Sequence, residues 1–368
     1  MKAQAGGAPL KDITVIDFSE LLPGPFLTQN LAELGARVIK IERPPHGDNA
    51  RLLGKGGFEA VNRGKQSLLA DLKDETQRDQ VRALIAEADV VVESYRPGVM
   101  ARLGLDAETL RKSHPRLIYV SLSGYGQTGP WADLPGHDIN YLAASGALAV
   151  SGPPEGEPSQ HFGLPVADLC GAMYALSATL AALVQRSNTG QGQHLDVALA
   201  DCMTHWMNPR LGAYRSGGIH TVAEQRHTTL VKAAYGAFRC GDGQYLSIAA
   251  LEDHFWQRLV QVLDLAPFDA EDYRRHDARK AHAEAINQGI ARAVANLDSR
   301  ELFERLQAHD IPAAPVIAPS ALATLPQFVS RDRFVAGEVL PLARFPVPMS
   351  GLHAVALNEA PSLGSLAH

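Results

Sequence analysis

The chain has 368 residues, which is long enough to form two domains with sizeable cores. Hydrophobic residues make up 46% of it and charged residues 20%, a balance typical of a globular protein and not of a disordered one. The formal net charge of −6 argues against a surface for nucleic acid, which would need an excess of basic side chains.

The cysteines and the apolar segments indicate the setting in which the protein works. Cys170, Cys202 and Cys240 are scattered without a Cys-x-x-Cys spacing, so neither a disulfide framework nor a zinc site is indicated. The N-terminus lacks an apolar core of signal-peptide length, and no later stretch is continuously apolar over the length of a bilayer. We therefore expect a soluble cytoplasmic protein with no bound metal, no membrane segment and no nucleic-acid partner.

Strand and helix patterns alternate through the first third of the chain. The expected elements are a strand at 13–18, a helix at 25–34, a strand at 38–42, a helix at 74–88, a strand at 89–93 and, after another helix, a strand at 117–122. This alternation predicts an α/β fold with a parallel, Rossmann-like sheet that binds ligands at the carboxyl ends of its strands. Those ends carry Arg43, the turn Tyr95-Arg96-Pro97-Gly98 and a loop beginning at Gly124.

The loop after the last of these strands contains Gly124-x-Gly126-x-x-Gly129, which fits the fingerprint of dinucleotide-binding proteins. That fingerprint requires a helix to begin within the glycines. Here Pro130 and Pro135 follow instead, and the residues between them have no helical continuation. We therefore reject a nicotinamide-dependent dehydrogenase and interpret the segment as an active-site loop.

Arg43, Arg63, Lys65 and Arg96 are the basic residues of the loops expected at the strand ends. Phosphate groups are bound by such donors, arginine through two parallel hydrogen bonds and lysine as a point charge. Scattered surface arginines would give the same pattern, so both interpretations stay open on the residues alone.

An acid/base pair is suggested by His137 and Asp168, each beside glycine or proline in apolar surroundings. The alanine- and leucine-rich run at 169–186 predicts a buried helix, which places Asp168 at its start. Backbone N–H groups there could hold an anionic oxygen of a substrate, although an ordinary N-cap would look the same. His137 could equally be a loop histidine bound to a backbone carbonyl. Its neighbour Asp138 could orient the imidazole, but we favour its capping a following helix.

The second half of the chain predicts a smaller α+β domain. Residues 211–229 are polar and poorly periodic, which is typical of a linker. A β-hairpin is expected at 234–250, followed by amphipathic helices at 253–263, 277–297 and 299–308. We therefore expect a large Rossmann-like domain over 1–210, completed by 320–368, and a small domain over 230–319.

Several motifs resemble those of the α-methylacyl-CoA racemases, which belong to the class III coenzyme A transferase superfamily. The resemblance covers nearly the whole chain. Its motifs are Pro23-Gly24-Pro25, Lys40-Ile41-Glu42-Arg43-Pro44, Asn62-Arg63-Gly64-Lys65, Glu93-Ser94-Tyr95-Arg96-Pro97-Gly98, Gly124-Tyr125-Gly126-Gln127-Thr128-Gly129-Pro130, Gly136-His137-Asp138-Ile139-Asn140-Tyr141, Pro165-Val166-Ala167-Asp168 and Thr189-Gly190-Gln191-Gly192-Gln193.

The resemblance implies a partner and several residue roles. It implies an interlocked homodimer of ring-like subunits, with each active site between the large domain of one chain and the small domain of the other. It implies that Arg43 and Arg96 contact the nucleotide of coenzyme A. It also matches Glu252 to a small-domain glutamate that organises the site, although an acidic residue beginning a helix is ordinary dipole complementation. No cofactor is expected beyond the coenzyme A part of the substrate.

Three departures from the formyl-CoA transferase branch favour the racemase branch. Leu22 stands where that branch has a functional glutamine, a flexible loop of consecutive glycines followed by glutamine has no counterpart, and Gly136-His137-Asp138 replaces Gly-Tyr-Asp. The leading hypothesis is an acyl-CoA racemase in which His137 and Asp168 exchange the α-proton on opposite faces of a 2-methylacyl-CoA, with the enolate oxygen held by N–H groups at the Asp168 helix.

Two alternatives are kept. A class III CoA-transferase would use Asp168 as a nucleophile that forms a mixed anhydride with the acyl group. An acyl-CoA-binding protein without turnover is the non-enzymatic alternative, which the presence of both His137 and Asp168 disfavours.

Overall fold

The structure is a computed structural model that describes residues 7–337, 341–350, 355 and 357–366. The chain divides into two compact units. The first comprises residues 1–148, 160–209 and 323–368, and the second comprises residues 149–159 and 210–322.

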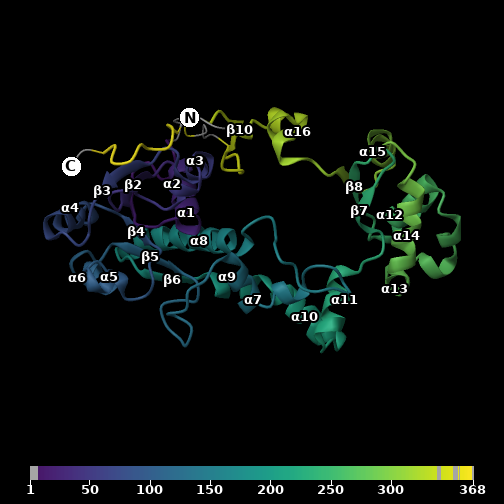
Figure 1. The fold of residues 1–368 in the computed structure, drawn as a ribbon, viewed down its shortest axis with the longest axis horizontal. Helices are drawn as coiled ribbons and strands as arrows, with labels where there is room; N and C mark the ends of the chain where they lie inside the picture. Colours follow the sequence, from purple (N-terminus) through teal and green to yellow (C-terminus); the bar gives the residue numbers. More distant parts are fainter. Residues whose placement is uncertain (1–6, 338–340, 351–354, 356, 367–368) are drawn as a thin grey trace. The chain divides into compact units, whose positions relative to one another are not determined.

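A six-stranded parallel sheet forms the centre of the first unit (Figure 1). Its strands are β1 (Thr14–Asp17), β2 (Arg37–Glu42), β3 (Gln66–Leu69), β4 (Val90–Glu93), β5 (Ile118–Ser123) and β6 (His194–Ala198). The spatial order is β3-β2-β1-β4-β5-β6, the order of doubly wound dinucleotide-binding folds. The expected mixed α/β fold with a parallel sheet is therefore confirmed.

Helices cover both faces of this sheet, because successive residues of each strand point to opposite sides. Val15 and Val90 belong to one buried cluster with α1 (Pro23–Glu33), α7 (Asp138–Ala144), α8 (Val166–Thr189) and α9 (Leu199–Trp206). Ile16 and Val91 belong to the opposite cluster with α4 (Glu75–Ala86), α5 (Val99–Arg102) and α6 (Ala107–Ser113). Both faces of the strands are thus buried, which explains their continuous apolar runs.

Short elements complete the first unit. They are α2 (Ala50–Leu53), α3 (Lys55–Asn62), α16 (Pro326–Ser330), β10 (Phe334–Val335) and β11 (Leu342–Ala343). The C-terminal segment lies along β3, where the Leu366 N–H donates to the Ser67 carbonyl (2.8 Å). The Arg51 guanidinium also donates to the Pro361 carbonyl (3.0 Å).

Helix α8 begins at Val166, three residues earlier than the sequence pattern predicts. By length and composition it could cross a membrane, with a mean hydropathy of 1.5, whereas we expected no such stretch. Its buried residues, among them Ala172 and Leu176, pack in the core beneath the sheet, as those of a core helix do.

The second unit holds an antiparallel sheet of β7 (Tyr235–Arg239), β8 (Tyr245–Ala249) and β9 (Ala313–Pro315). Around it lie α12 (Asp253–Leu263), α14 (Ala283–Val294) and α15 (Ser299–Ala308), with Trp256 and Ile290 in the shared core. The helix expected at 277–297 is divided into α13 (His276–Lys280) and α14. Arg279, in the last turn of α13, is fully buried, and its guanidinium donates to the carbonyls of Tyr273, Arg274 and Leu251.

The segment 211–229, expected as a linker, is helical instead and belongs to the second unit. It contains most of α10 (Asn208–Gly217) and α11 (Val222–Leu230). The Thr221 hydroxyl accepts from the Glu224 N–H while the Glu224 carboxylate accepts from the Thr221 N–H, which is a capping box. The Thr-x-x-Glu signal was present in the sequence, but weak hydrophobic periodicity concealed the helix.

Candidate active site

The reversal of strand order between β1 and β4 creates a crevice at the carboxyl ends of the strands, where such sheets bind ligands. A cleft of about 380 Å³ lies there. Its lining comes from the loops after β1, β2, β4 and β5 and from α7, α8 and α9, and includes Glu20, Arg43, Tyr95, His137 and Asp168. Residues far apart in the sequence therefore meet in one site.

Two further cavities adjoin this cleft. One of about 470 Å³ shares Tyr95 and His137 with it and is lined by Arg96. The other, of about 280 Å³, shares Arg43 and Tyr95 and adds Lys73 and Arg102. Sequence reasoning missed Lys73 and Arg102, although Lys73 follows the end of β3 and Arg102 ends the short helix after β4.

Asp168 is the third residue of α8, and the helix N-cap is Pro165, so the alternative that Asp168 is an ordinary N-cap is excluded. Burial raises the pKa of the Asp168 carboxyl to about 7, and the nearby Asp138 carboxylate adds to that effect. Asp168 therefore changes protonation near neutral pH, which is uncommon for an aspartate and typical of catalytic carboxyls.

Asp138 caps α8 from a distance. Its Oδ1 accepts hydrogen bonds from the N–H groups of Ala167 (2.7 Å) and Asp168 (3.1 Å). Asp138 is therefore a capping residue, as we favoured, but the helix that it caps is α8. It does not cap α7, because it is the first residue of that helix and His137 is the N-cap. The N–H groups that we expected to hold an enolate oxygen at α8 are thus occupied by Asp138, and that expectation is corrected.

His137 is an exposed residue that shares the cleft with Asp168. Its N–H donates to Asn140 Oδ1 (2.9 Å) and its carbonyl accepts from the Asn140 N–H (2.8 Å), which fixes the backbone at the start of α7. No hydrogen bond joins the His137 imidazole to the Asp168 carboxylate, although both side chains belong to the described part of the chain.

Glycines shape the loop between β5 and α7. A Cβ atom at Gly124 would lie 2.4 Å from the Tyr141 ring, and one at Gly136 would lie 2.7 Å from it, so only glycine permits this close approach. The Tyr141 hydroxyl also donates to the Gly136 carbonyl (2.7 Å). The next helix begins only at Asp138. No helix begins within the glycines at 124–129, as Pro130 and Pro135 led us to expect.

Glu20 is a cleft residue that sequence reasoning missed. Its N–H donates to Ser94 Oγ (3.2 Å), and its Oε2 accepts from Asn49 Nδ2 (2.6 Å). Burial raises the pKa of the Glu20 carboxyl, and Asp48 adds to that effect. No local motif marks this residue.

Lys65 does not lie in the cleft, contrary to our expectation. Its ammonium group is fully buried and donates to Asp17 Oδ2 (3.1 Å), Thr28 Oγ1 (2.7 Å), Asn62 Oδ1 (2.8 Å) and the Pro25 carbonyl (3.0 Å). Burial would raise the pKa of Asp17, but Lys65 and Lys40 lower that pKa to about 2. Lys65 therefore neutralises a buried carboxylate and is not available to a ligand.

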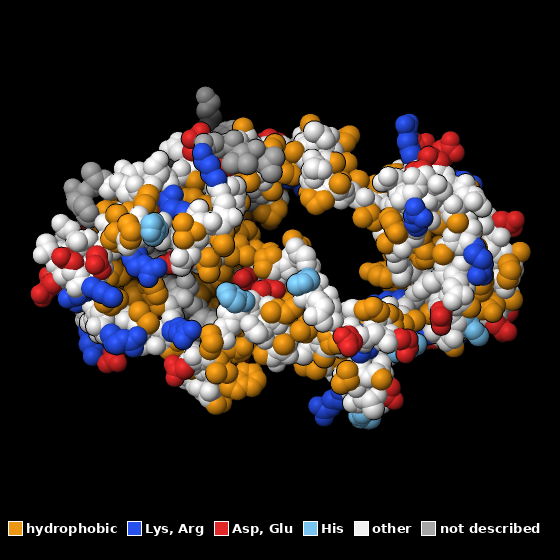
Figure 2. All heavy atoms as spheres, in the orientation of Figure 1, with side chains coloured by type: hydrophobic (Ala, Val, Ile, Leu, Met, Phe, Trp, Pro, Cys, Tyr) orange, Lys and Arg blue, Asp and Glu red, His pale blue; other side chains and the backbone are white. Residues whose placement is uncertain are grey.

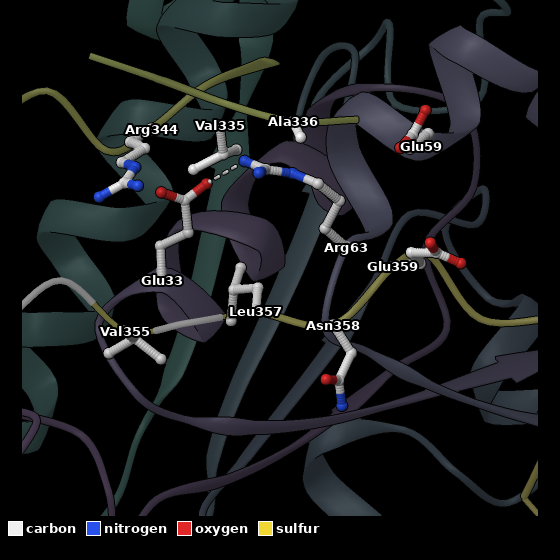
Figure 3. A pocket seen from close by; sticks show the side chains of 10 residues that line it. All are labelled: Glu33, Glu59, Arg63, Val335, Ala336, Arg344, Val355, Leu357, Asn358 and Glu359. Atoms are coloured by element: carbon white, nitrogen blue, oxygen red, sulfur yellow. Dashed lines mark hydrogen bonds and ion pairs between the residues drawn. The ribbon is translucent and has the colours of Figure 1, made fainter. Parts of the chain in front are cut away.

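Arg63 also lies outside the cleft. Its side chain lines a separate cavity of about 260 Å³, where it forms an ion pair with Glu33 (2.9 Å), as Figure 3 shows. Arg344, Leu357 and Glu359 line the same cavity (Figure 3). The loop position alone did not reveal that the side chain turns toward Glu33 and the C-terminal segment.

Glu252 belongs to the second unit, where it is an exposed residue at the N-cap position of α12. The cleft described above is built from the first unit, so a role for Glu252 stays a prediction. Among the residues that the structure describes, no cluster of His, Cys, Asp and Glu could hold a metal ion.

Comparisons with known proteins identify similar chains. A family model described as CoA-transferase family III matches residues 10–366. Acetyl-CoA:oxalate CoA-transferase of Acetobacter aceti is 35% identical over 93% of this chain and 90% of its own length. Succinate–glutarate CoA-transferase of Agrobacterium fabrum is 34% identical, with 97% and 93% covered. A solved structure of a CAIB/BAIF family protein from Brucella suis matches with a TM-score of 0.85 and 31% identity, covering 98% and 97% of the two chains.

The names of these relatives bear on the racemase hypothesis. Both relatives are called CoA-transferases. The racemase branch is therefore not shown, and the similarity favours the transferase alternative.

Proposed function

The chain belongs to CoA-transferase family III, and we propose on that premise that it transfers coenzyme A between carboxylic acids with Asp168 as the nucleophile. The observation that carries the proposal is the Asp168 carboxylate, held in a cleft at the carboxyl ends of the strands by a helix whose first turn is capped by Asp138. A carboxylate that is fixed and partly desolvated suits attack on a thioester.

The proposed reaction balances without any other reactant. An Asp168 oxygen bonds to the thioester carbonyl carbon, the carbon–sulfur bond breaks, and coenzyme A leaves as a thiolate. The thiolate then attacks the Asp168 carbonyl carbon of the anhydride and releases the first carboxylate, leaving an aspartyl thioester. An acceptor carboxylate attacks this thioester and expels the thiolate, which finally attacks the acceptor acyl carbon and regenerates Asp168. No cofactor beyond coenzyme A is required.

Basic side chains around the cleft support a place for the phosphates of coenzyme A. Arg43 lines both the main cleft and the cavity that contains Lys73 and Arg102, while Arg96 lines the other adjoining cavity. Guanidinium groups bind phosphate oxygens in pairs. We propose that these four residues bind the nucleotide part of the substrate. We also propose, from the family resemblance, that Glu252 helps to organise the hydrogen bonds of an active site.

One observation favours racemisation as a second candidate. His137 and Asp168 line the same cleft, so two groups that can carry protons face one volume. Against this candidate, Asp138 already occupies the N–H groups of Ala167 and Asp168 that would hold an enolate oxygen.

A single incubation distinguishes the two reactions. The protein is mixed with a 2-methylacyl-CoA in deuterated water, with and without a free carboxylic acid. We expect coenzyme A to appear on the added acid and hydroxylamine to trap an acylated Asp168, detected by mass spectrometry. Deuterium at the α-carbon without any transfer would replace the transferase proposal by the racemase one. If neither transfer nor deuterium exchange occurs but coenzyme A binds, the protein is an acyl-CoA-binding protein without turnover.

We also propose that the protein works as a homodimer. Helix α8 leaves an apolar stripe uncovered within its own unit, with Met173 40% and Val184 65% exposed, and Trp206 of α9 is 51% exposed. Hydrophobic side chains gather at the surface of the first unit where Figure 1 draws α8 and α9 (Figure 2). Exposed apolar patches of this kind mark interaction surfaces, and a second copy is the partner implied by the family resemblance.

A further inference from the structure

Glu20 stands at the switch point of the sheet. It follows β1, and its N–H bonds to the hydroxyl of Ser94, which follows β4. The strand order reverses between these two strands, so Glu20 lies at the crevice in which open α/β sheets bind ligands. Its side chain lines the same cleft as Asp168.

The backbone around Glu20 is held in place before any ligand binds. Leu21 adopts φ of 65°, a left-handed conformation that is strained for a leucine. The Leu21 N–H donates to Asp48 Oδ1 (2.9 Å), and Asp48 is fixed by a buried ion pair with Lys40 (2.8 Å). Strain that the surroundings maintain in this way is concentrated at functional sites.

The charges of the cleft fall into two groups. Glu20 interacts with Arg43 and Tyr95 beside the strand ends, whereas Asp168 interacts with Asp138 and Tyr141 at the start of α8. Arg43, Glu20 and Asp168 line one cleft, so a thioester that reaches from Arg43 to Asp168 passes through the cavity that Glu20 lines. In coenzyme A the arm between the phosphates and the thioester is pantetheine, whose amide N–H groups and hydroxyl are hydrogen-bond donors.

An ionised carboxylate only accepts hydrogen bonds, so it suits those donors and repels phosphate. One oxygen of Glu20 accepts from Asn49, which orients the carboxylate. We propose that Glu20 binds the pantetheine arm of the substrate by accepting a hydrogen bond from an amide N–H or hydroxyl group. This inference rests on the proposed function, because it requires a coenzyme A ligand in the cleft.

The test compares two ligands by isothermal titration calorimetry. Free coenzyme A contains the pantetheine arm, and 3′-phospho-ADP is the same nucleotide without it. Glu20→Ala should weaken binding of coenzyme A about tenfold and change binding of 3′-phospho-ADP less than twofold. Glu20→Gln, which keeps an acceptor oxygen, should bind coenzyme A within about threefold of the wild type.

Three results would overturn the proposal. Unchanged coenzyme A affinity in Glu20→Ala would remove Glu20 from the site. Equal weakening of both ligands would mean that Glu20 acts by positioning Arg43. Tighter binding of both would mean that it merely repels the phosphates. If Glu20→Ala does not fold, Glu20→Asp keeps the charge but withdraws it by one methylene, and a loss confined to coenzyme A supports the proposal while no loss contradicts it.

Two controls separate this inference from the proposed function. Glu87→Gln removes one negative charge from the exposed C-cap position that follows α4 and should leave both affinities unchanged. If the wild-type protein binds neither ligand, the proposed function fails. If it binds both and Glu20→Ala behaves like the wild type, only the role of Glu20 fails.

Discussion

Two carboxylates with different surroundings define the chemistry of the cleft. Burial raises the pKa of Asp168 to about 7, whereas one oxygen of Asp138 accepts hydrogen bonds from the N–H groups at the start of α8. Asp168 must be ionised to attack a thioester, so kcat/KM for transfer should rise with pH through about 7. A carboxyl group placed at an ordinary solvated position would already be fully ionised at that pH.

Asp138→Asn tests this coupling. The asparagine oxygen can still accept the two N–H groups, so α8 should keep its cap, but the charge that disfavours ionised Asp168 is gone. The pH profile of kcat/KM should therefore move to lower pH, with the thermal midpoint nearly unchanged. A profile that stays in place would show that Asp138 does not act on the Asp168 charge.

Asp168→Asn should reduce transfer by more than about a thousandfold, since the nucleophile is lost. The effect on stability has a defined sign. The folded pKa of Asp168 is raised, so its favourable contribution is present below its unfolded pKa and is lost as pH rises through about 7. The variant should thus melt like the wild type near pH 4 and about 2 °C higher at pH 8. Equal thermal midpoints of the variant and the wild type at both pH values would contradict a buried Asp168 carboxylate whose ionisation is disfavoured.

His137→Ala distinguishes the two proposed reactions at one residue. A transferase forms its anhydride on Asp168 alone, so the variant should keep transfer within about tenfold of the wild type. A racemase needs a proton carrier on each face and should lose interconversion entirely. The measurement is transfer of coenzyme A to an added carboxylate, alongside deuterium exchange at the α-carbon.

At the scale of elements, the loop from Gly124 to Gly136 depends on its packing against α7. Gly124→Ala would place a Cβ atom 2.4 Å from the Tyr141 ring, and the loop that lines the cleft would have to shift. We expect a loss of about 1–3 kcal/mol in the free energy of unfolding, together with reduced kcat/KM. Gly57→Ala in α3 is the matched control, because nothing lies within 4 Å of its added Cβ atom. Chemical denaturation of both variants checks the difference.

At the scale of the whole molecule, the exposed apolar stripe of α8 predicts self-association. Val184→Glu replaces a residue that is 65% exposed within its own unit, so in an isolated chain the change should cost less than about 0.5 kcal/mol. In the proposed dimer the charge would be buried, and sedimentation should detect monomer where the wild type is dimeric. A wild-type protein that stays monomeric and active at all concentrations would refute the dimer.

Much of the fold could be predicted because local sequence patterns indicate it. Apolar runs alternating with helical segments indicate a parallel α/β sheet, and the chain position of Arg43 and Arg96 after strands places them at the ligand-binding edge. The helix that follows Pro165 and the hairpin of β7 and β8 are likewise readable from composition and turn residues. Each of these inferences needs only neighbours in the chain.

The tertiary structure alone decided which loops meet and where their side chains turn. The strand order makes Glu20 a neighbour of Ser94, folding brings Asp138 to the start of α8, and Lys65 turns inward to a buried Asp17. The physical reason is that these contacts join residues far apart in sequence, and no local period encodes the partner of a buried polar group. The requirement that each such group be paired determines the arrangement only once the whole core is assembled.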